Sequence, residues 1–294
     1  MKAYGSEKRR YVARRAGGIA LALAAGAAVA ALATSAHAEY GYATPGQIGF
    51  QSPVTELARY LQWFHNDVLV PLIFVISLFV LALLGYVVWR FNEKANPVPS
   101  KTTHNTLIEI VWTIAPVIIL VFIAIPSFRL LTMQFTFPPA DLTVKVVASQ
   151  WHWNYGYPKE AGGFAFDSYI KEDKELKPGD IKLLAVDNEA VVPVNKVVHL
   201  EVTSTDVIHS FIVQSFGVRI DAVPGRLNKI WFKADREGVY YGQCSKICGK
   251  DHAFMPIAFR VVSQQQYDAW LLDAKKRYAS ADSAVQVAGD EVRH

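Results

Sequence analysis

Two cysteines, a histidine and a methionine lie close together near the C-terminal end of this 294-residue chain. Their spacing is Cys244-Ser-Lys-Ile-Cys248-Gly-Lys-Asp-His252-Ala-Phe-Met255, and the chain has 2 cysteines in total. Thiolate and thioether sulfur atoms favour copper, and imidazole nitrogen also suits it. An electron-transfer copper needs a second histidine, which His209 supplies 35 residues before Cys244. The sequence therefore predicts a copper site.

The second cysteine changes the kind of copper site that is expected. One cysteine serves a single copper ion, whereas two cysteines four residues apart can bridge two ions, each bound by one histidine. Met255 and a backbone carbonyl would be the weaker axial ligands. A short-loop disulfide and a zinc site are the alternatives. Methionine as a donor, and a loop placed between two strands, count against both.

The region that carries these residues is predicted to be built from β-strands. Alternating, β-branched segments predict strands at residues 142–147, 181–186, 196–202, 209–214, 228–234, 238–241 and 257–262. Short strands without intervening helices indicate an antiparallel sandwich or barrel. One early histidine, followed by Cys, His and Met on the last long loop, is the layout of a cupredoxin domain, expected at residues 134–263. A C-terminal helix and tail follow at 264–294, with Ser263 and Gln266 as a capping box.

Two uncharged apolar runs precede this domain, at Val68–Trp89 and Ile110–Phe128. Each is long enough to cross about 30 Å of hydrocarbon as a helix. The connecting stretch carries more Lys and Arg than the flanking segments, so the positive-inside rule places it in the cytoplasm. The sequence thus predicts a transmembrane hairpin at residues 68–133, with a periplasmic segment at 39–67 before it and the β domain in the periplasm.

The first 38 residues have the three parts of a secretory signal. A basic start precedes an Ala-rich apolar run and the cleavage sequence Ala36-His37-Ala38. An uncleaved first membrane helix is the alternative. This segment holds six Lys or Arg and one Glu, so the remaining chain changes from the formal +4 to −1. The basic pI of about 8.9 belongs to the signal, and nucleic acid is not an expected partner.

The chain closely resembles subunit II of cytochrome c oxidase from about residue 50 to residue 278. The loop C-S-K-I-C-G-K-D-H-A-F-M-P-I is similar to the binuclear copper A motif of that family. SQWHWNYGYP at 149–158 resembles its aromatic segment, and 205–228 resembles the region of its first histidine ligand. The resemblance implies that electrons pass from cytochrome c to copper A and then to haem a in subunit I. Oxygen is reduced there and protons are pumped.

The segment from Cys244 to Met255 is called the copper loop below. The same resemblance implies roles for residues outside this loop. Trp151 would be the residue where electrons arrive, because an exposed indole lets a haem edge approach without desolvating a charge. Glu109 would lie at the entrance of a proton path into subunit I, and a helix-capping carboxylate is the alternative. Acids that would face the lysines of cytochrome c are Asp187, Asp206 and Asp221. Subunits I and III of the oxidase and the bilayer of the bacterial inner membrane are the other expected partners.

Lys246 is a departure from the family pattern. The family has Glu at this position, with its carbonyl on copper and its carboxylate on a magnesium or manganese ion at the boundary with subunit I. A backbone carbonyl does not depend on the side chain, so the copper ligand is retained. An ammonium group cannot bind a metal cation. We therefore expect magnesium or manganese to be absent, or bound without this subunit.

Two other functions compete with an electron-accepting oxidase subunit. A quinol oxidase subunit would have the same fold without copper, and possession of every copper ligand counts against it. A membrane-tethered copper carrier would need an open, exchangeable site, whereas this loop is short and flanked by strands.

Overall fold

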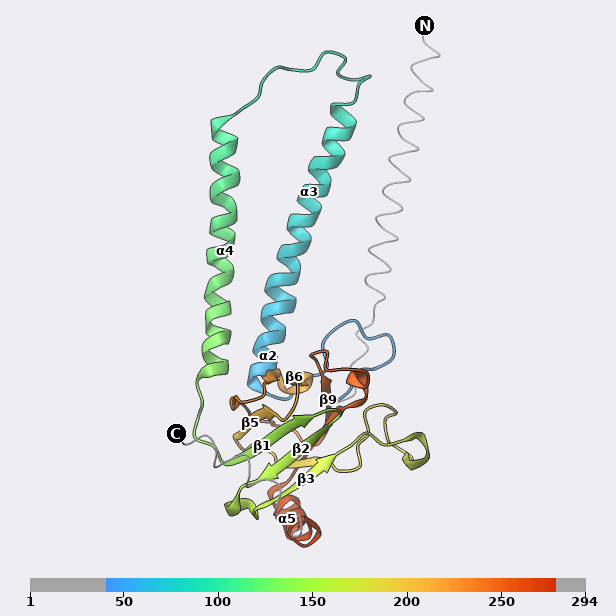
Figure 1. The fold of residues 1–294 in the computed structure, drawn as a ribbon. Helices are drawn as coiled ribbons and strands as arrows, with labels where there is room; N and C mark the ends of the chain where they lie inside the picture. The colour runs from blue at the N-terminus through green and yellow to red at the C-terminus, as the bar shows by residue number, and fades with distance from the viewer. Residues whose placement is uncertain (1–40, 279–294) are drawn as a thin grey trace.

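The computed structural model describes residues 41–278, so the expected signal at residues 1–38 lies outside the described residues. Two long helices rise from one end of a two-layer β-sandwich, and α5 lies at the opposite end (Figure 1). The α-helices and the π-helix η1 are α2 (Glu56–Trp63), η1 (Phe64–Leu69), α3 (Val70–Arg90), α4 (Thr106–Phe135) and α5 (Gln264–Tyr278). Short 3-10 helices are η2 (Lys159–Ala161), η3 (Asp173–Glu175), η4 (Gln214–Phe216) and η5 (His252–Phe254).

Both apolar runs are helical, and both helices extend beyond the runs. The first is continuous over Glu56–Arg90, 35 residues, with a mean hydropathy of 3.0 in its most apolar stretch. It starts before the apolar run because the Thr55 side chain accepts a hydrogen bond from the Ala58 N–H, and Leu57 and Ala58 are buried. The second covers Thr106–Phe135, 30 residues, with a mean hydropathy of 2.6. A helix needs about 20 residues to cross a bilayer core, so both are long enough.

Within the described residues, ten strands form two five-stranded sheets. The strands are β1 (Leu142–Ser149), β2 (His152–Tyr157), β3 (Phe164–Ser168), β4 (Ala190–Pro193), β5 (Val198–Ser204), β6 (His209–Val213), β7 (Val218–Ala222), β8 (Asn228–Phe232), β9 (Gly238–Cys244) and β10 (Pro256–Val262). The sheet orders are β3-β2-β1-β5-β8 and β4-β10-β9-β6-β7. The predicted sandwich is confirmed, but its purely antiparallel pairing is wrong, because β1 pairs with β5 and β10 with β4 in parallel.

One predicted strand is also wrong. Residues 181–186 form a turn in which Ile181 O accepts hydrogen bonds from the N–H groups of Leu184 and Ala185. Leu183 has φ 70°, a left-handed conformation that breaks a strand. Only Val186 joins β structure, through a bridge to Ile170. The pattern was misleading here because Ile181 and Leu184 pack beside Val186 without being in a strand, whereas Leu183 is 48% exposed.

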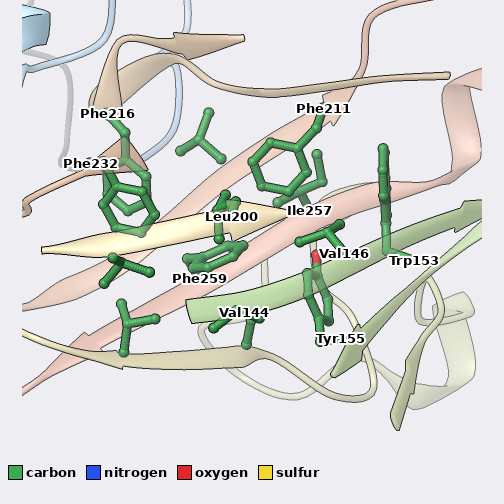
Figure 2. Close-up of a cluster of buried hydrophobic side chains, with 14 of the residues drawn as sticks. Val144, Val146, Trp153, Tyr155, Leu200, Phe211, Phe216, Phe232, Ile257 and Phe259 are labelled. Atoms are coloured by element: carbon green, nitrogen blue, oxygen red, sulfur yellow. The ribbon is translucent and has the colours of Figure 1, made fainter. Parts of the chain in front are cut away.

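The core lies between the two sheets and is rich in aromatic rings. Side chains of β1 and β5 alternate between buried and partly exposed, so each strand gives one face to the core. Phe259 of β10 lies near the middle of this cluster (Figure 2). Its ring meets the rings of Tyr155, Phe211 and Phe232 edge to face, at centroid distances of 5.6, 5.8 and 5.9 Å. Such pairs add specific geometry to apolar burial.

We predict that Phe259→Ala lowers the free energy of unfolding of the sandwich by about 3–5 kcal/mol, because truncation of a fully buried ring leaves a cavity. Leu272→Ala is the control, since Leu272 on α5 is 64% exposed and its loss should change the stability by about 0.5 kcal/mol or less. Chemical denaturation followed by near-ultraviolet circular dichroism measures both. Equal effects of the two substitutions would contradict this account of the core.

Candidate metal centre

The two cysteines lie at the end of β9 and in the loop that follows it. Their Sγ atoms are 3.8 Å apart, and both are free thiols with buried side chains. A disulfide has a sulfur–sulfur distance near 2.05 Å, so the disulfide alternative is not what the structure contains. The loop is held at both ends, because Gln243 of β9 pairs with Pro256 of β10.

Each cysteine faces one histidine. His209 Nδ1 lies 3.9 Å from Cys244 Sγ, and His252 Nδ1 lies 3.5 Å from Cys248 Sγ. Met255 Sδ lies 3.6 Å from Cys248 Sγ. The ligand atoms of His209, Cys244 and Cys248 are all within 4.8 Å of one another. The structure therefore brings together the donors that the sequence singled out between His209 and Met255.

The register of β6 against β9 places His209 beside Cys244. Phe211 of β6 pairs with Cys244 of β9. The two strands approach closely just before the cysteine, where a Cβ on Gly242 would lie 1.9 Å from Ile212 O. A glycine is required at this position, since any side chain would force the strands apart.

Lys246 sends its backbone and its side chain in different directions. Its carbonyl oxygen lies 3.3 Å from Cys244 Sγ, on the side of the sulfur atoms. Its Nζ lies 3.7 Å from Asp221 Oδ2 on β7, and the lysine side chain is 49% exposed. The carbonyl is thus available to the centre whatever the side chain is, as expected from the sequence.

The two thiols differ in acidity. Burial raises the pKa of the Cys244 thiol, but its hydrogen bond with His209 and backbone interactions with Lys246 and Ser210 outweigh burial and lower the pKa to about 6. Burial and the charge of the Cys244 thiolate raise the pKa of Cys248 to about 12. Cys244 is therefore ready to bind a cation as a thiolate at neutral pH, whereas Cys248 loses its proton when a cation binds.

The donor set selects among metals. Two thiols and a thioether are soft sulfur donors, and imidazole nitrogen also binds copper, so the set suits copper. Zinc in structural sites is held by cysteine, histidine or carboxylate ligands, and the thioether of Met255, 1% exposed beside Cys248, has no place in that set. The residues present therefore fit copper better than zinc.

Trp151 lies against the loop and remains half-buried. Its indole Nε1 donates a hydrogen bond to Cys248 O at 3.2 Å, and Lys250 Nζ lies 5.6 Å from the ring centroid. A Cβ on Gly249 would lie 2.8 Å from Trp151 Cζ2. Trp153, in contrast, is fully buried and donates to Met255 O at 3.1 Å. Of the two tryptophans, only Trp151 reaches the surface.

Asp206 makes contacts that the sequence did not suggest. Its Oδ1 lies 2.9 Å from His209 Nε2, and its Oδ2 accepts a hydrogen bond from the Gln150 backbone N–H at 2.6 Å. Gln150 Nε2 in turn donates to Cys248 O at 2.7 Å. The three-residue spacing of Asp206 and His209 was the available signal for the first contact. No sequence signal marked Gln150, because its partners lie far away in the chain.

The other predicted site residues make hydrogen bonds or ion pairs with protein groups. Glu109 Oε1 accepts a hydrogen bond from the backbone N–H of Asn105, the residue that caps α4. Asp187 Oδ1 accepts the backbone N–H of Tyr169 at 2.7 Å, and Asp221 pairs with Lys246. The proton-path role of Glu109 and the docking roles of the three acids stay predictions.

A β-sandwich with soft metal donors at one end and two long apolar helices before it defines a membrane-anchored, cupredoxin-like domain. The family model "Cytochrome C oxidase subunit II, periplasmic domain" matches residues 142–262. The model "Cytochrome C oxidase subunit II, transmembrane domain" matches residues 43–130. The chain belongs to the cytochrome c oxidase subunit II family.

Individual relatives agree with this assignment. A protein of Rickettsia felis named probable cytochrome c oxidase subunit 2 is 50% identical over 232 residues, which are 79% of this chain and 73% of that protein. The cytochrome c oxidase subunit 2 of Cereibacter sphaeroides is 45% identical over 276 residues, 86% of this chain and 90% of its own. The solved periplasmic domain of subunit II of cytochrome oxidase (CoxB) from Bradyrhizobium japonicum is 55% identical in sequence, with a TM-score of 0.45. The match covers 49% of this chain and 99% of the solved domain. The family models and the two curated relatives show that the chain is an oxidase subunit with two membrane helices and an external C-terminal domain.

Proposed function

We propose that this subunit accepts electrons from cytochrome c at a binuclear copper A centre and passes them to haem a in subunit I. Oxygen reduction there is coupled to proton pumping. The observation that carries the proposal is the pair of cysteine sulfur atoms 3.8 Å apart, each facing one histidine. A carrier site would be open to exchange, whereas the side chains of Cys244 and Cys248 are only 6% and 5% exposed.

Six residues would hold the two copper ions. Cys244 and Cys248 would supply the two thiolates, His209 and His252 would supply one imidazole each, and the Met255 thioether and the Lys246 carbonyl would be the weaker ligands. Copper supplies a one-electron redox couple shared between two ions. The chain keeps the donors in place through β6, β9 and β10, so their arrangement changes little between the two redox states.

The partners and the membrane follow from this role. A cytochrome c with a ring of lysines is the donor, and Asp187, Asp206 and Asp221 are its proposed docking acids. Subunits I and III share the bilayer of the bacterial inner membrane with α3 and α4. The β domain lies in the periplasm, where the donor is found, and residues 90–106 face the cytoplasm.

We predict that the full-length chain, purified in detergent under reducing conditions and then given copper, binds two copper ions. It should show a near-infrared absorption band and a multi-line EPR spectrum. Cys248→Ser should abolish both signals, because only one bridging sulfur remains. Ser245→Ala is the control, since the Ser245 hydroxyl is buried without a hydrogen-bond partner among the described residues.

The other outcomes point to the other functions. A four-line spectrum from one copper ion would contradict the binuclear centre. A colourless protein that binds no copper would favour the quinol oxidase subunit. Two ions that a weak chelator removes within minutes would favour the copper carrier.

We also propose that electrons arrive at Trp151. It is the tryptophan of the aromatic segment that reaches the surface, and its Nε1 contacts Cys248 O. In the purified oxidase, Trp151→Phe should slow electron transfer from reduced cytochrome c without changing the copper content, because the indole N–H contact is lost. Stopped-flow absorbance measures the rate, with Trp89→Phe on α3 as the control. An unchanged rate in Trp151→Phe would exclude this route.

The last part of the proposal concerns Lys246. Its ammonium group lies 3.7 Å from Asp221 Oδ2. A positive charge there would repel a magnesium or manganese ion rather than bind it. We propose that magnesium or manganese at the boundary with subunit I is absent, or is bound without this subunit.

Metal analysis and manganese EPR of the purified oxidase test this. We predict no manganese bound through this subunit in the unaltered complex grown with manganese, and a gain of manganese in Lys246→Glu, which introduces a carboxylate. Lys250→Glu is the matched control from the same loop, with a side chain 78% exposed, and should gain none. Stoichiometric magnesium or manganese in the unaltered complex that is lost in Lys246→Ala would contradict the proposal.

A further inference from the structure

The carboxylate of Asp206 contacts both a predicted copper ligand and the segment that supports the copper loop. Oδ1 lies 2.9 Å from His209 Nε2 and also accepts the Val207 backbone N–H at 2.6 Å. Oδ2 accepts the Gln150 backbone N–H at 2.6 Å. The Asp206 side chain is 30% exposed and the His209 side chain is fully buried. This carboxylate is therefore held in one orientation by groups from two parts of the chain.

The contact with Asp206 determines which nitrogen of His209 is free. An ionised carboxylate only accepts hydrogen bonds, so Nε2 of His209 carries the proton in this pair. When His209 is neutral, as a metal ligand must be, its lone pair then lies on Nδ1, the atom that faces Cys244 Sγ at 3.9 Å. Carboxylate partners of this kind orient metal-binding histidines and make them stronger donors.

Gln150 extends the contact to the other half of the centre. Its side-chain Nε2 donates to Cys248 O at 2.7 Å, and the next residue, Trp151, donates to the same oxygen at 3.2 Å. Because the backbone N–H of Gln150 also binds Asp206, a short chain of hydrogen bonds runs from His209 to Cys248. It links β6, the end of β1 and the copper loop.

We propose that Asp206 and Gln150 act as positioning residues that fix the distance between the His209 side and the Cys248 side of the centre. We call this pair the Asp206–Gln150 clamp. The inference rests on the proposed copper A function and adds two residues to it. It assigns the partly exposed Asp206 carboxylate a contact with His209, so Asp206 affects the redox properties of the centre and not only the docking of cytochrome c.

Two substitutions at position 206 separate the negative charge from the hydrogen bond to His209. In Asp206→Asn, the amide oxygen can still accept the His209 N–H, but the negative charge is lost and the amide NH2 cannot accept the Gln150 N–H. We therefore expect copper to be retained and the reduction potential to rise. In Asp206→Ala, the orientation of His209 is lost as well, and copper affinity falls by about 10- to 100-fold. Voltammetry and competition with a copper chelator measure these effects on the full-length chain in detergent.

A third substitution tests the other end of the clamp. Gln150→Leu has a similar size but leaves Cys248 O without its 2.7 Å donor, so the copper hyperfine pattern in EPR should change and copper should dissociate faster. Asp141→Asn is the matched control. Asp141 also accepts a backbone N–H, from Val197 at 2.8 Å, and lies before the start of β1, whereas Gln150 follows its end.

The outcomes distinguish the clamp from the function on which it rests. If the unaltered chain lacks the binuclear signals, the proposed function fails and the clamp fails with it. If the unaltered chain shows them and Asp206→Asn has the same potential as Asp141→Asn, only the clamp is overturned. Slower reaction of Asp206→Asn with cytochrome c at an unchanged potential would also overturn it, because Asp206 would then act in docking alone. Thermal unfolding of each variant before copper addition excludes general misfolding as the cause.

Discussion

The candidate metal centre depends on the close approach of two buried thiols, which would repel each other if both were ionised. Cys244 Sγ and Cys248 Sγ are 3.8 Å apart, and like charges at that distance repel strongly where water is excluded. Ionisation of Cys244 therefore helps to raise the pKa of Cys248 to about 12. Both thiols can be thiolates at neutral pH only when positive charge lies between them. The pair is unfavourable as two bare anions and favourable as a ligand pair, so the site itself selects a cation.

The surrounding fold prevents the sulfur atoms from relaxing apart. Cys244 is fixed by β9, which approaches β6 so closely at Gly242 that no side chain fits. The far end of the loop is fixed by β10 and by the hydrogen bond from Trp153 Nε1 to Met255 O. Trp153 is fully buried in the same aromatic core as Phe259. Packing of the sandwich core therefore helps to fix the positions of the metal donors in the copper loop.

Local features of this site could be predicted from the sequence, and long-range ones could not. The copper loop was identifiable because most donors lie within one segment. The membrane helices were identifiable because each uncharged run is long enough to cross a bilayer core. Parallel pairing of β1 with β5 was missed, since it depends on where strands meet in space. The turn at Leu183 alternates like a strand in sequence but has φ 70°. The contact of Gln150 with Asp206 joins residues 56 positions apart, beyond the reach of spacing rules.

The first membrane helix packs directly against the residues that follow β6, the strand that begins with His209. Thr55, which caps α2, also donates its hydroxyl to Phe216 O at 2.8 Å. Gly217 lies so close to α2 that a Cβ there would be 2.8 Å from Ala58 Cα. Both contacts lie directly after β6, the strand that begins with His209. Because α2 runs without interruption through η1 into α3, the orientation of His209 relative to the membrane is set by packing and not by a flexible linker. The proposed electron acceptor, held in this way, would keep a constant distance to a partner in the same bilayer.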